Sequence, residues 1–329
     1  MEDITKLFES FSSLRVGVIG DLMLDTYMWG NVERISPEAP VPVVSLHHRE
    51  LRIGGAGNVA LNIESLGAKV SILSVLGKDD DGNKLLQLLQ QHKIDTSYLL
   101  NTADRITTNK IRVISRNQQM MRLDSEITND LSGELERLLF KKLELYINNE
   151  KPDIIIFEDY NKGVLTENFL HNAIAVCRKK KILTAADPKR RNFFAYRNID
   201  IYKPNLKEVK EGLNLIFDEV DTTLLNNIHA ELYGILKHGI SLITLSEKGI
   251  FYKDNNKSSI IPSHMRNISD VSGAGDTVIA VASLVYAATR NAHLMAEIAN
   301  IAGGLVCEEV GTVAINREKL QQECLFLLS

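Results

Sequence analysis

Short apolar runs alternate along this chain with longer segments in which apolar residues recur every three to four positions. The short runs are rich in Val, Ile and Leu and predict strands, whereas the longer segments predict amphipathic helices. Strands followed by helices, with almost continuous apolar content, indicate a parallel sheet covered by helices on both faces. The predicted strands are 15–20, 70–76, 153–157, 182–186, 199–202, 241–245 and 250–253, and the predicted helices are 58–66, 82–92, 131–148, 166–180, 206–213, 222–238, 274–288 and 292–310.

Two segments break this alternation. Residues 27–46 contain three prolines before an alternating stretch, and residues 107–124 alternate apolar and polar positions. A period of two is typical of strands with one wet face, so we predict a small antiparallel β lid near these segments. A lid suits a polyhydroxylated, anionic ligand, although a solvated edge hairpin would show the same pattern. The polar face of the predicted lid carries Arg112, Arg116, Asn117, Gln118 and Arg122.

Composition limits the classes of protein to which the chain can belong. Charged residues make up 24% and hydrophobic residues 44% of its 329 positions, which is typical of a soluble globular protein. The net charge of −4 provides no general field for nucleic acid or anionic membranes. The acidic N-terminus and the lack of a long apolar window predict neither a signal peptide nor a membrane span. We expect a cytoplasmic protein with a single domain over residues 1–329 and buried, unpaired cysteines.

Residues 270–276, with the sequence DVSGAGD, are the most informative stretch, and a long apolar helix pattern follows them. Gly273, Ala274 and Gly275 are small enough for several N–H groups to converge on one point, which forms an anion hole reinforced by the helix dipole. Asp276 lies in the first helical turn, where a carboxylate could accept a hydroxyl proton during phosphoryl transfer. Its position near a helix N-terminus predicts a low pKa. A capped helix start is the alternative.

A second group of residues suits the binding of a sugar. Gly54 and Gly55 allow a close approach of the backbone to a ligand, and Asn58 offers both a donor and an acceptor. Asp21 and Asp25 follow the first strand and could accept hydrogen bonds from hydroxyl groups, although Asp21 could equally cap a turn. The glycine spacing does not fit a dinucleotide fingerprint, which disfavours an oxidoreductase.

A third group suits a nucleotide and its metal. Asn205 and Glu208 form a capping-box spacing, and Glu208 could instead act on Mg²⁺ through water; spacing alone favours the cap. Thr244, Ser246 and Gly249 form a turn whose hydroxyls could donate to phosphates, although a plain β-turn would look similar. The chain has no P-loop motif.

Together these motifs resemble the ribokinase-like (PfkB) carbohydrate kinases over nearly the whole chain. The Gly-Gly motif with Asn58 and the 270–276 segment match the two family signatures, in order. More specific strings are similar to those of D-glycero-β-D-manno-heptose 7-phosphate kinases. These strings are 34–43 (RISPEAPVPV), 115–119 (SRNQQ) with 122–124 (RLD), 159–163 (DYNKG) and 187–189 (DPK). The chain departs from the subgroup pattern at Glu158, Asn161 and Ser272, where Ser, Ala and Thr are expected.

The resemblance implies a three-layer α/β/α fold with a mostly parallel sheet and a small β lid. It implies ATP-dependent phosphorylation of O1 of heptose 7-phosphate for ADP-heptose and lipopolysaccharide core synthesis, with Mg²⁺ held by Glu208 through water and a monovalent cation left open. It also implies a homodimer formed through the lid. Many kinases of this subgroup are fused to a nucleotidyltransferase domain, and because the sequence ends at Ser329 we expect a stand-alone kinase. A kinase of another sugar or nucleoside, or a non-catalytic sugar-binding regulator, remains as an alternative.

The charge balance adds a prediction about the distant phosphate of such a substrate. A chain with a net charge of −4 must gather cations locally to hold a sugar phosphate beside ATP. We expect Arg116, together with Lys162 or Lys189, to hold the 7-phosphate, because guanidinium groups pair well with phosphate oxygens and lysines act as point charges. A solvated basic turn at residues 189–191 is the alternative.

Overall fold

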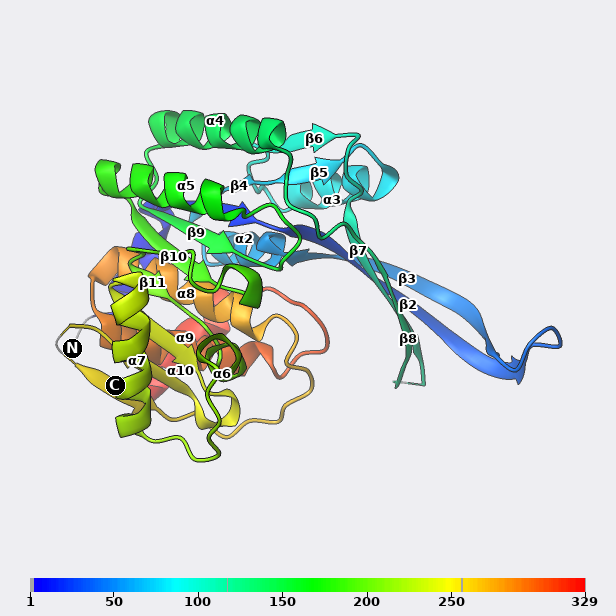
Figure 1. Ribbon diagram of the computed structural model, residues 1–329. Coiled ribbons are helices and arrows are strands. Elements are labelled where there is room, and N and C mark those ends of the chain that lie inside the picture. Colours follow the sequence, from blue (N-terminus) through cyan, green and yellow to red (C-terminus); the bar gives the residue numbers. More distant parts are fainter. Residues whose placement is uncertain (1–2, 117, 256, 329) are drawn as a thin grey trace.

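The computed structural model describes residues 3–116, 118–255 and 257–328, and it divides them between a helix-covered sheet and a projecting β arm (Figure 1). The central sheet has the strand order β14-β13-β12-β11-β10-β9-β1-β4. Its strands from β4 to β12 pair in parallel, and β13 and β14 add an antiparallel edge. These strands are β1 (Arg15–Gly20), β4 (Lys69–Leu73), β9 (Ile154–Glu158), β10 (Leu183–Asp187), β11 (Ile201–Tyr202), β12 (Ile240–Thr244), β13 (Ile250–Lys253) and β14 (Ser258–Ile261).

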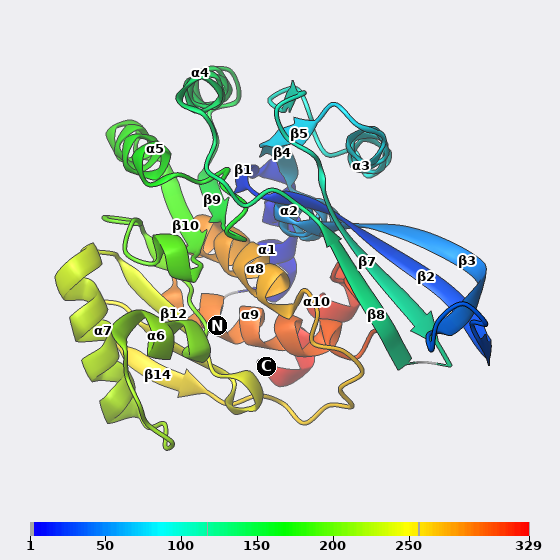
Figure 2. The ribbon, with the colours of Figure 1, turned by 45° about the vertical axis from the view of Figure 1, so that its right-hand side comes forward.

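Alternate residues of the buried strands face two separate hydrophobic clusters. On β9, Ile154 and Ile156 join one cluster, whereas Ile155 and Phe157 join the other. Helices cover both faces of the sheet, as predicted (Figure 2). The first cluster includes α1 (Ile4–Ser10), α2 (Ala56–Ser65), α3 (Asp80–Gln91), α8 (Ala274–Thr289), α9 (Ala292–Val306) and α10 (Arg317–Leu327), and the second includes α4 (Gly133–Glu150), α5 (Glu167–Lys180), α6 (Leu206–Leu213) and α7 (Thr222–Leu236).

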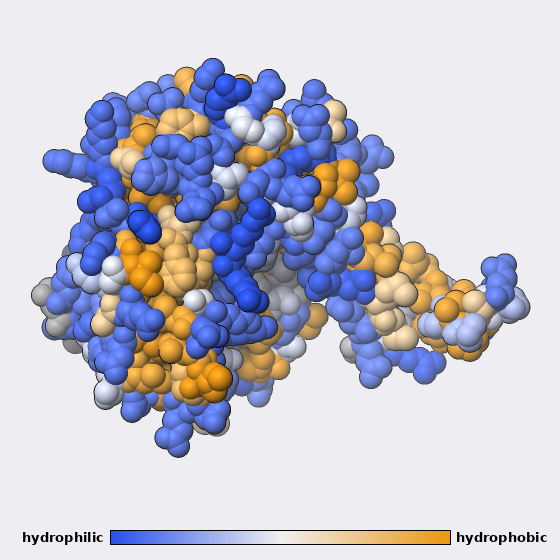
Figure 3. Space-filling view, in the orientation of Figure 1, coloured by the Kyte–Doolittle hydropathy of each residue, from blue (hydrophilic) through white to orange (hydrophobic). Residues whose placement is uncertain are grey.

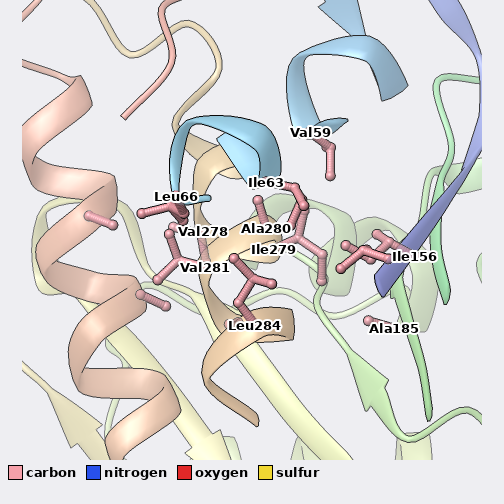
Figure 4. Close-up of a cluster of buried hydrophobic side chains, with 14 of the residues drawn as sticks. Val59, Ile63, Leu66, Ile156, Ala185, Val278, Ile279, Ala280, Val281 and Leu284 are labelled. Carbon is pink, nitrogen blue, oxygen red and sulfur yellow. The ribbon is translucent and has the colours of Figure 1, made fainter. Parts of the chain in front are cut away.

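Helix α8 is the central helix of the first cluster. Its residues Ile279 and Leu284 lie among Val59 and Ile63 of α2 and Ile156 of β9 (Figure 4). Every residue from Asp276 to Val285 is buried, so the helix is fixed on all sides. Burial of this kind contributes roughly 1.5–3 kcal/mol for each large aliphatic side chain. The packing therefore places the N-terminus of α8 firmly against the sheet.

The projecting arm is the predicted lid, a separate four-stranded sheet with the order β3-β2-β7-β8. It consists of β2 (Leu22–Ile35), β3 (Pro42–Gly55), β7 (Thr108–Ser115) and β8 (Gln118–Ser125). The β2–β3 and β7–β8 pairs are antiparallel, and β2 pairs with β7 in parallel. The lid is longer than predicted, because β2 begins directly after Asp21 and β3 continues to Gly55.

Several elements differ from the sequence predictions. The predicted strand 70–76 is two strands, because Ser74 donates a buried hydrogen bond to the Gly20 carbonyl and β5 (Val75–Gly77) leaves the sheet to pair with β6 (Leu100–Thr102). The predicted helix 292–310 ends at Val306. Helices α1 and α10 and strand β14 were not predicted. Single turns of 3₁₀ helix occur at Phe11–Ser13, Arg190–Asn192 and Ser246–Lys248. Among the described residues, no helix combines the length and apolar character that a membrane span needs.

Candidate active site

The candidate site lies where parallel strands of the central sheet end and α8 begins. Glu158 and Asp187 are the last residues of β9 and β10, and Lys203 directly follows β11. The carboxyl ends of parallel strands meet at one edge, where α/β sheets bind their ligands. Gly275 of α8 lies over this edge: a Cβ atom there would be 3.6 Å from both Asp187 Oδ2 and Lys203 Nζ.

The loop before α8 has the geometry that an anion hole needs. Gly273 is the N-cap with a φ of 79°, a left-handed conformation that favours glycine. Its carbonyl accepts from Thr277 N at 3.0 Å, which leaves the N–H groups of the first turn without intrahelical partners. Asp270 holds the loop in place by accepting from Ser272 N at 3.0 Å and from Gly311 N at 2.9 Å. The anion hole at Gly273, Ala274 and Gly275 stays a prediction, because Ala274 N donates to the Val271 carbonyl at 3.3 Å and an anion would compete with this turn bond.

Asp276 is buried in the first turn of α8, with 4% of its surface exposed. Its Oδ2 accepts from Asn58 Nδ2 at 2.8 Å, and its Oδ1 accepts from the Tyr160 hydroxyl at 2.7 Å. Burial raises the pKa of Asp276 to about 6, although both hydrogen bonds lower it. The low pKa expected from the helix N-terminus was therefore wrong, because loss of water outweighs the helix dipole. A carboxyl group with this pKa is ionised at neutral pH and is a better base than an ordinary aspartate.

Two lysines and two carboxylates form a charged cluster beside Asp276. Lys189 Nζ lies 3.1 Å from Asp187 Oδ1 and 2.7 Å from Glu208 Oε1, and Lys203 Nζ lies 2.8 Å from Asp187 Oδ2. Burial alone would raise the pKa of Asp187, but the two ammonium groups hold it below its usual value. Burial and the neighbouring Asp187 raise the pKa of Glu208. The cluster thus presents two lysine ammonium groups close to the anion hole.

Glu158, one of the departures from the subgroup pattern, adds a third carboxyl group to this region. Its side chain is fully buried, and neither oxygen has a hydrogen-bond partner among residues 3–116, 118–255 and 257–328. Burial, followed by the charges of Asp187 and Asp276, raises the pKa of Glu158 well above its usual value. A buried acid without a partner is most stable when it carries its proton.

Oxygen atoms of Glu158, Asp187 and Asp276 lie within 4.8 Å of one another, a spacing that could hold a cation. Both oxygens of Asp187 already face lysines, however, and both oxygens of Asp276 accept hydrogen bonds. Glu208 is engaged as well, with Lys189 at Oε1 and Asn205 N at Oε2, but it lies at the slightly exposed rim of the cluster, where a metal-bound water could reach the remaining lone pairs.

The sugar-side candidates meet at the base of the lid. Asp25 lies on β2 rather than in a turn, and its Oδ1 is 2.5 Å from Arg112 Nη1 of β7. A Cβ atom on Gly54 would approach Asp25 Oδ2 to 2.4 Å, so glycine keeps space open around this carboxylate. Gly55 has a φ of 60° and is the N-cap of α2, which carries Asn58. Arg112 was noted on the lid, but its pairing with Asp25 was not predicted.

Asp21 caps the loop that follows β9. It is 1% exposed, and its two oxygens accept from the N–H groups of Tyr160, Lys162 and Val164 at 2.8, 3.0 and 3.1 Å. These bonds support the alternative in which Asp21 is a turn cap. Asp21 holds the 160–164 loop, and a direct contact with a sugar remains an untested prediction.

The candidate nucleotide-binding residues adopt the capping-box and turn structures that were given above as alternatives. Asn205 and Glu208 form a complete capping box at the start of α6. Thr244 pairs with Asn205 through an isolated β-bridge, which brings the ends of β11 and β12 together. Ser246 is exposed in the following turn, and Gly249 closes that turn with a φ of 95°. Thr244 therefore lies beside Asn205, at the start of the helix that carries Glu208.

The predicted phosphate-binding residues do not form one cluster. Arg116 and Gln118 are exposed at the β7–β8 turn, and Asn117 lies outside the described residues. Lys162 Nζ pairs with Glu126 Oε2 at 2.7 Å. Lys189 is engaged with Asp187 and Glu208, so its geometry does not favour the predicted contact with a distant phosphate. Tyr160 and Lys203 were not among the predicted site residues. Tyr160 lies two residues after the end of β9, and Lys203 directly follows β11. The rule that α/β sheets bind ligands at the carboxyl ends of their strands would have pointed to both.

Comparisons with known proteins agree with this arrangement. The model of the pfkB family of carbohydrate kinases matches residues 13–319. The chain belongs to the PfkB family. Members of this family are described as carbohydrate kinases.

Relatives of this PfkB kinase include two proteins named bifunctional protein HldE. The one from Syntrophotalea carbinolica is 38% identical over 97% of this chain and 65% of its own length. The one from Methylobacillus flagellatus is 40% identical over 93% of this chain and 62% of its own length. The chain thus spans less than two thirds of the length of these relatives.

Solved structures show the same ribokinase-like fold. Phosphofructokinase-2 from Escherichia coli in complex with potassium superposes with a TM-score of 0.80 at 18% identity, covering 96% of this chain and 100% of that one. The same enzyme in complex with fructose-6-phosphate gives a TM-score of 0.78 at 17% identity, again covering 96% and 100%. The predicted fold class of this PfkB kinase is therefore confirmed.

Proposed function

We propose that this PfkB kinase transfers the γ-phosphate of ATP to O1 of D-glycero-β-D-manno-heptose 7-phosphate. The geometry of Asp276 carries the proposal of phosphoryl transfer: a buried carboxylate with a pKa of about 6 lies in the first turn of a helix that presents an anion hole. The choice of heptose 7-phosphate rests on the strings at 34–43, 115–119, 159–163 and 187–189. The product would supply ADP-heptose for the lipopolysaccharide core.

Each residue of the site has a distinct task in this reaction. Asp276 accepts the proton of the O1 hydroxyl as the bond to phosphorus forms, and a loose transition state needs this transfer only late. The N–H groups of Gly273, Ala274 and Gly275 stabilise the charge on the transferred phosphoryl group. Lys203, which lies below Gly275, adds positive charge to the same region. Asp25, Gly54, Gly55 and Asn58 orient the sugar from the base of the lid.

ATP and Mg²⁺ are the partners that the proposal requires. Mg²⁺ neutralises phosphate charge when it is bound, and Glu208 would hold it through water at the rim of the site. Asn205, Thr244, Ser246 and Gly249 would contact the nucleotide from the same side. A monovalent cation is a further proposal, and replacing potassium with choline in the assay would test it.

The lid supports the proposal of a homodimer. Large apolar side chains are exposed along it, including Ile35, Leu46, Met121 and Leu123 at 61, 54, 55 and 50%. Figure 3 shows hydrophobic surface gathered on this arm. Pairing of two lids would cover such a surface, because unpaired sheet edges and apolar patches favour association. Light scattering of the wild type and of Met121→Glu would test the interface: the variant should be monomeric.

A panel of substrates tests the proposed activity. ADP release is measured with heptose 7-phosphate, heptose, fructose 6-phosphate, ribose and a nucleoside, and ³¹P NMR locates the new phosphate. We expect the highest kcat/KM for heptose 7-phosphate and a product phosphorylated at O1. A higher kcat/KM for another acceptor would assign the chain to a different kinase of the same family.

A further inference from the structure

The proposed base, Asp276, is held from two sides. Asn58 of α2 occupies one lone pair of Oδ2, and the Tyr160 hydroxyl occupies one lone pair of Oδ1. A carboxylate oxygen has two lone pairs, so both oxygens can still accept a substrate hydroxyl. The two donors therefore fix the plane of the carboxylate without blocking it.

The Tyr160 hydroxyl is itself fixed by the loop that carries it. The N–H groups of Tyr160, Lys162 and Val164 all donate to the buried Asp21 carboxylate. Asn161 N donates to Asp159 Oδ1 at 2.7 Å. Four of the five residues from 160 to 164 are thus anchored at the end of β9, and the Tyr160 side chain extends from them towards α8.

Two lysines from different parts of the site contact the Tyr160 ring. Lys110 Nζ of lid strand β7 lies 5.4 Å from the ring centroid, and Lys189 Nζ lies 5.5 Å from it. Such contacts are typical of cation–π interactions and restrict the ring further. Lys189 also contacts Asp187 and Glu208, so the ring lies between the lid and the charged cluster.

We propose that Tyr160 is a positioning residue, which orients Asp276 and keeps it in its ionised form through the phenol hydrogen bond. This inference deepens the proposed function and rests on Asp276 being the base. Burial keeps the pKa of Tyr160 well above its usual value, so the phenol remains a donor over the working range. A donor to a carboxylate favours the ionised form, and its removal should raise the pKa of Asp276.

Tyr160→Phe tests the inference, because it removes one oxygen and keeps the ring. We expect the acid limb of the profile of kcat against pH to move to higher pH by about one unit. The plateau of kcat should fall roughly tenfold, because the carboxylate is no longer fixed. KM for ATP should change little. An acid limb that coincides with the wild type would overturn the proposal.

Tyr196→Phe is the matched control. The Tyr196 hydroxyl donates to Asp159 Oδ2 at 2.9 Å, so this variant also removes a buried phenol–carboxylate bond near the same loop, but not one to Asp276. It should lower the melting temperature and leave the acid limb of kcat in place. A shift of the limb equal to that of Tyr160→Phe would show a general effect of loop disruption and would overturn the specific role.

Two further measurements test the inference: one needs no substrate, and the other does not use the Phe variant. The carboxyl carbon of Asp276, assigned by its absence in Asp276→Asn, can be titrated by ¹³C NMR without any sugar; its pKa should rise in Tyr160→Phe. Site-specific 3-fluorotyrosine at position 160 provides a more acidic, stronger donor and should lower that pKa. An unchanged titration in both proteins would refute the role of Tyr160. Failure of heptose 7-phosphate as a substrate would instead refute only the proposed acceptor.

Discussion

Asn58 Nδ2 donates to Asp276 Oδ2 over 2.8 Å, which joins two residues that are 218 positions apart in the chain. Asn58 belongs to the glycine motif that opens α2, and Asp276 belongs to the anion-hole segment that opens α8. The two helices pack against each other on one face of the sheet. The two most informative motifs of the sequence therefore form a single site.

Asp276→Asn should reduce kcat by about 10²- to 10⁴-fold, because the amide cannot accept the hydroxyl proton. Binding of ATP and of the sugar phosphate, measured by calorimetry, should persist. Asp221→Asn is the control: Asp221 caps α7, and asparagine caps helices equally well. Turnover of Asp276→Asn within about threefold of the wild type would remove the residue from the mechanism.

The pH dependence of the wild type should follow the ionisation of Asp276. Its pKa is raised to about 6, and the base acts only when it is ionised. The value of kcat/KM should therefore rise with pH up to about 6 and level off above it. The profile is measured in buffers of constant ionic strength, with the coupling enzymes in excess. A limb near pH 4 would mean that the base is not the buried carboxyl group described.

Gly273→Ala should impair both folding and turnover. The φ of 79° disfavours alanine, and its Cβ would lie 2.8 Å from Asn58 Nδ2, the donor to Asp276. Gly234→Ala is the control, since Gly234 lies within α7 and its Cβ would meet nothing within 4 Å. This control should raise the free energy of unfolding by roughly 0.5–1 kcal/mol. Equal stability of the two variants in denaturant titrations would contradict the expected strain.

The buried pair His229 and His238 should make the fold sensitive to acid. Ser241 Oγ lies 2.9 Å from His229 Nδ1 and 2.6 Å from His238 Nε2, and burial lowers the two pKa values to about 4 and about 3. Below about pH 6.5 both histidines are protonated in the unfolded chain, whereas they remain neutral in the folded protein. The free energy of unfolding is therefore not reduced by these histidines above about pH 6.5. It decreases as the pH falls towards 4, by up to about 1.4 kcal/mol per pH unit for each histidine.

Replacing both histidines with glutamine should flatten this dependence between pH 6.5 and 4. Urea titrations at each pH measure the free energy of unfolding. His92→Gln, at an exposed position, is the control and should keep the slope of the wild type. If the double variant shows the same slope as the wild type, other groups cause the acid sensitivity.

Lys162 is predicted to contribute to holding the 7-phosphate. Lys162→Met should therefore weaken the binding of heptose 7-phosphate more than the binding of heptose without its phosphate. The ammonium group lies beside Glu126 at present, so a bound phosphate would have to compete with this carboxylate. Comparison of the two KM values isolates the phosphate contact, and Lys180→Met at the exposed end of α5 is the control. Equal losses for both sugars would place the phosphate elsewhere, with Arg116 as the next candidate.

The sequence by itself determined the layers of the fold and predicted the residues of the candidate site. Periodicity of two and of 3.6 predicted the parallel sheet, the covering helices and the lid, because these patterns depend on local backbone geometry. The small residues before α8 predicted an anion hole beside Asp276, because close convergence of N–H groups depends on local residue size and on the helix start. Strand β14, the split after Leu73 and the length of the lid were missed, because they depend on contacts with distant segments.

Only the tertiary structure decided the pKa values and the charge partners of the ionisable groups in the site. Asp276 lies at a helix N-terminus, which predicted a low pKa, yet burial raises that pKa to about 6. Lys189 is predicted to contact the distant phosphate, and folding pairs it with Asp187 and Glu208, which no local pattern of the sequence indicates. The physical reason is that desolvation and charge pairing depend on three-dimensional neighbours, whereas periodicity and turn chemistry are properties of the chain itself.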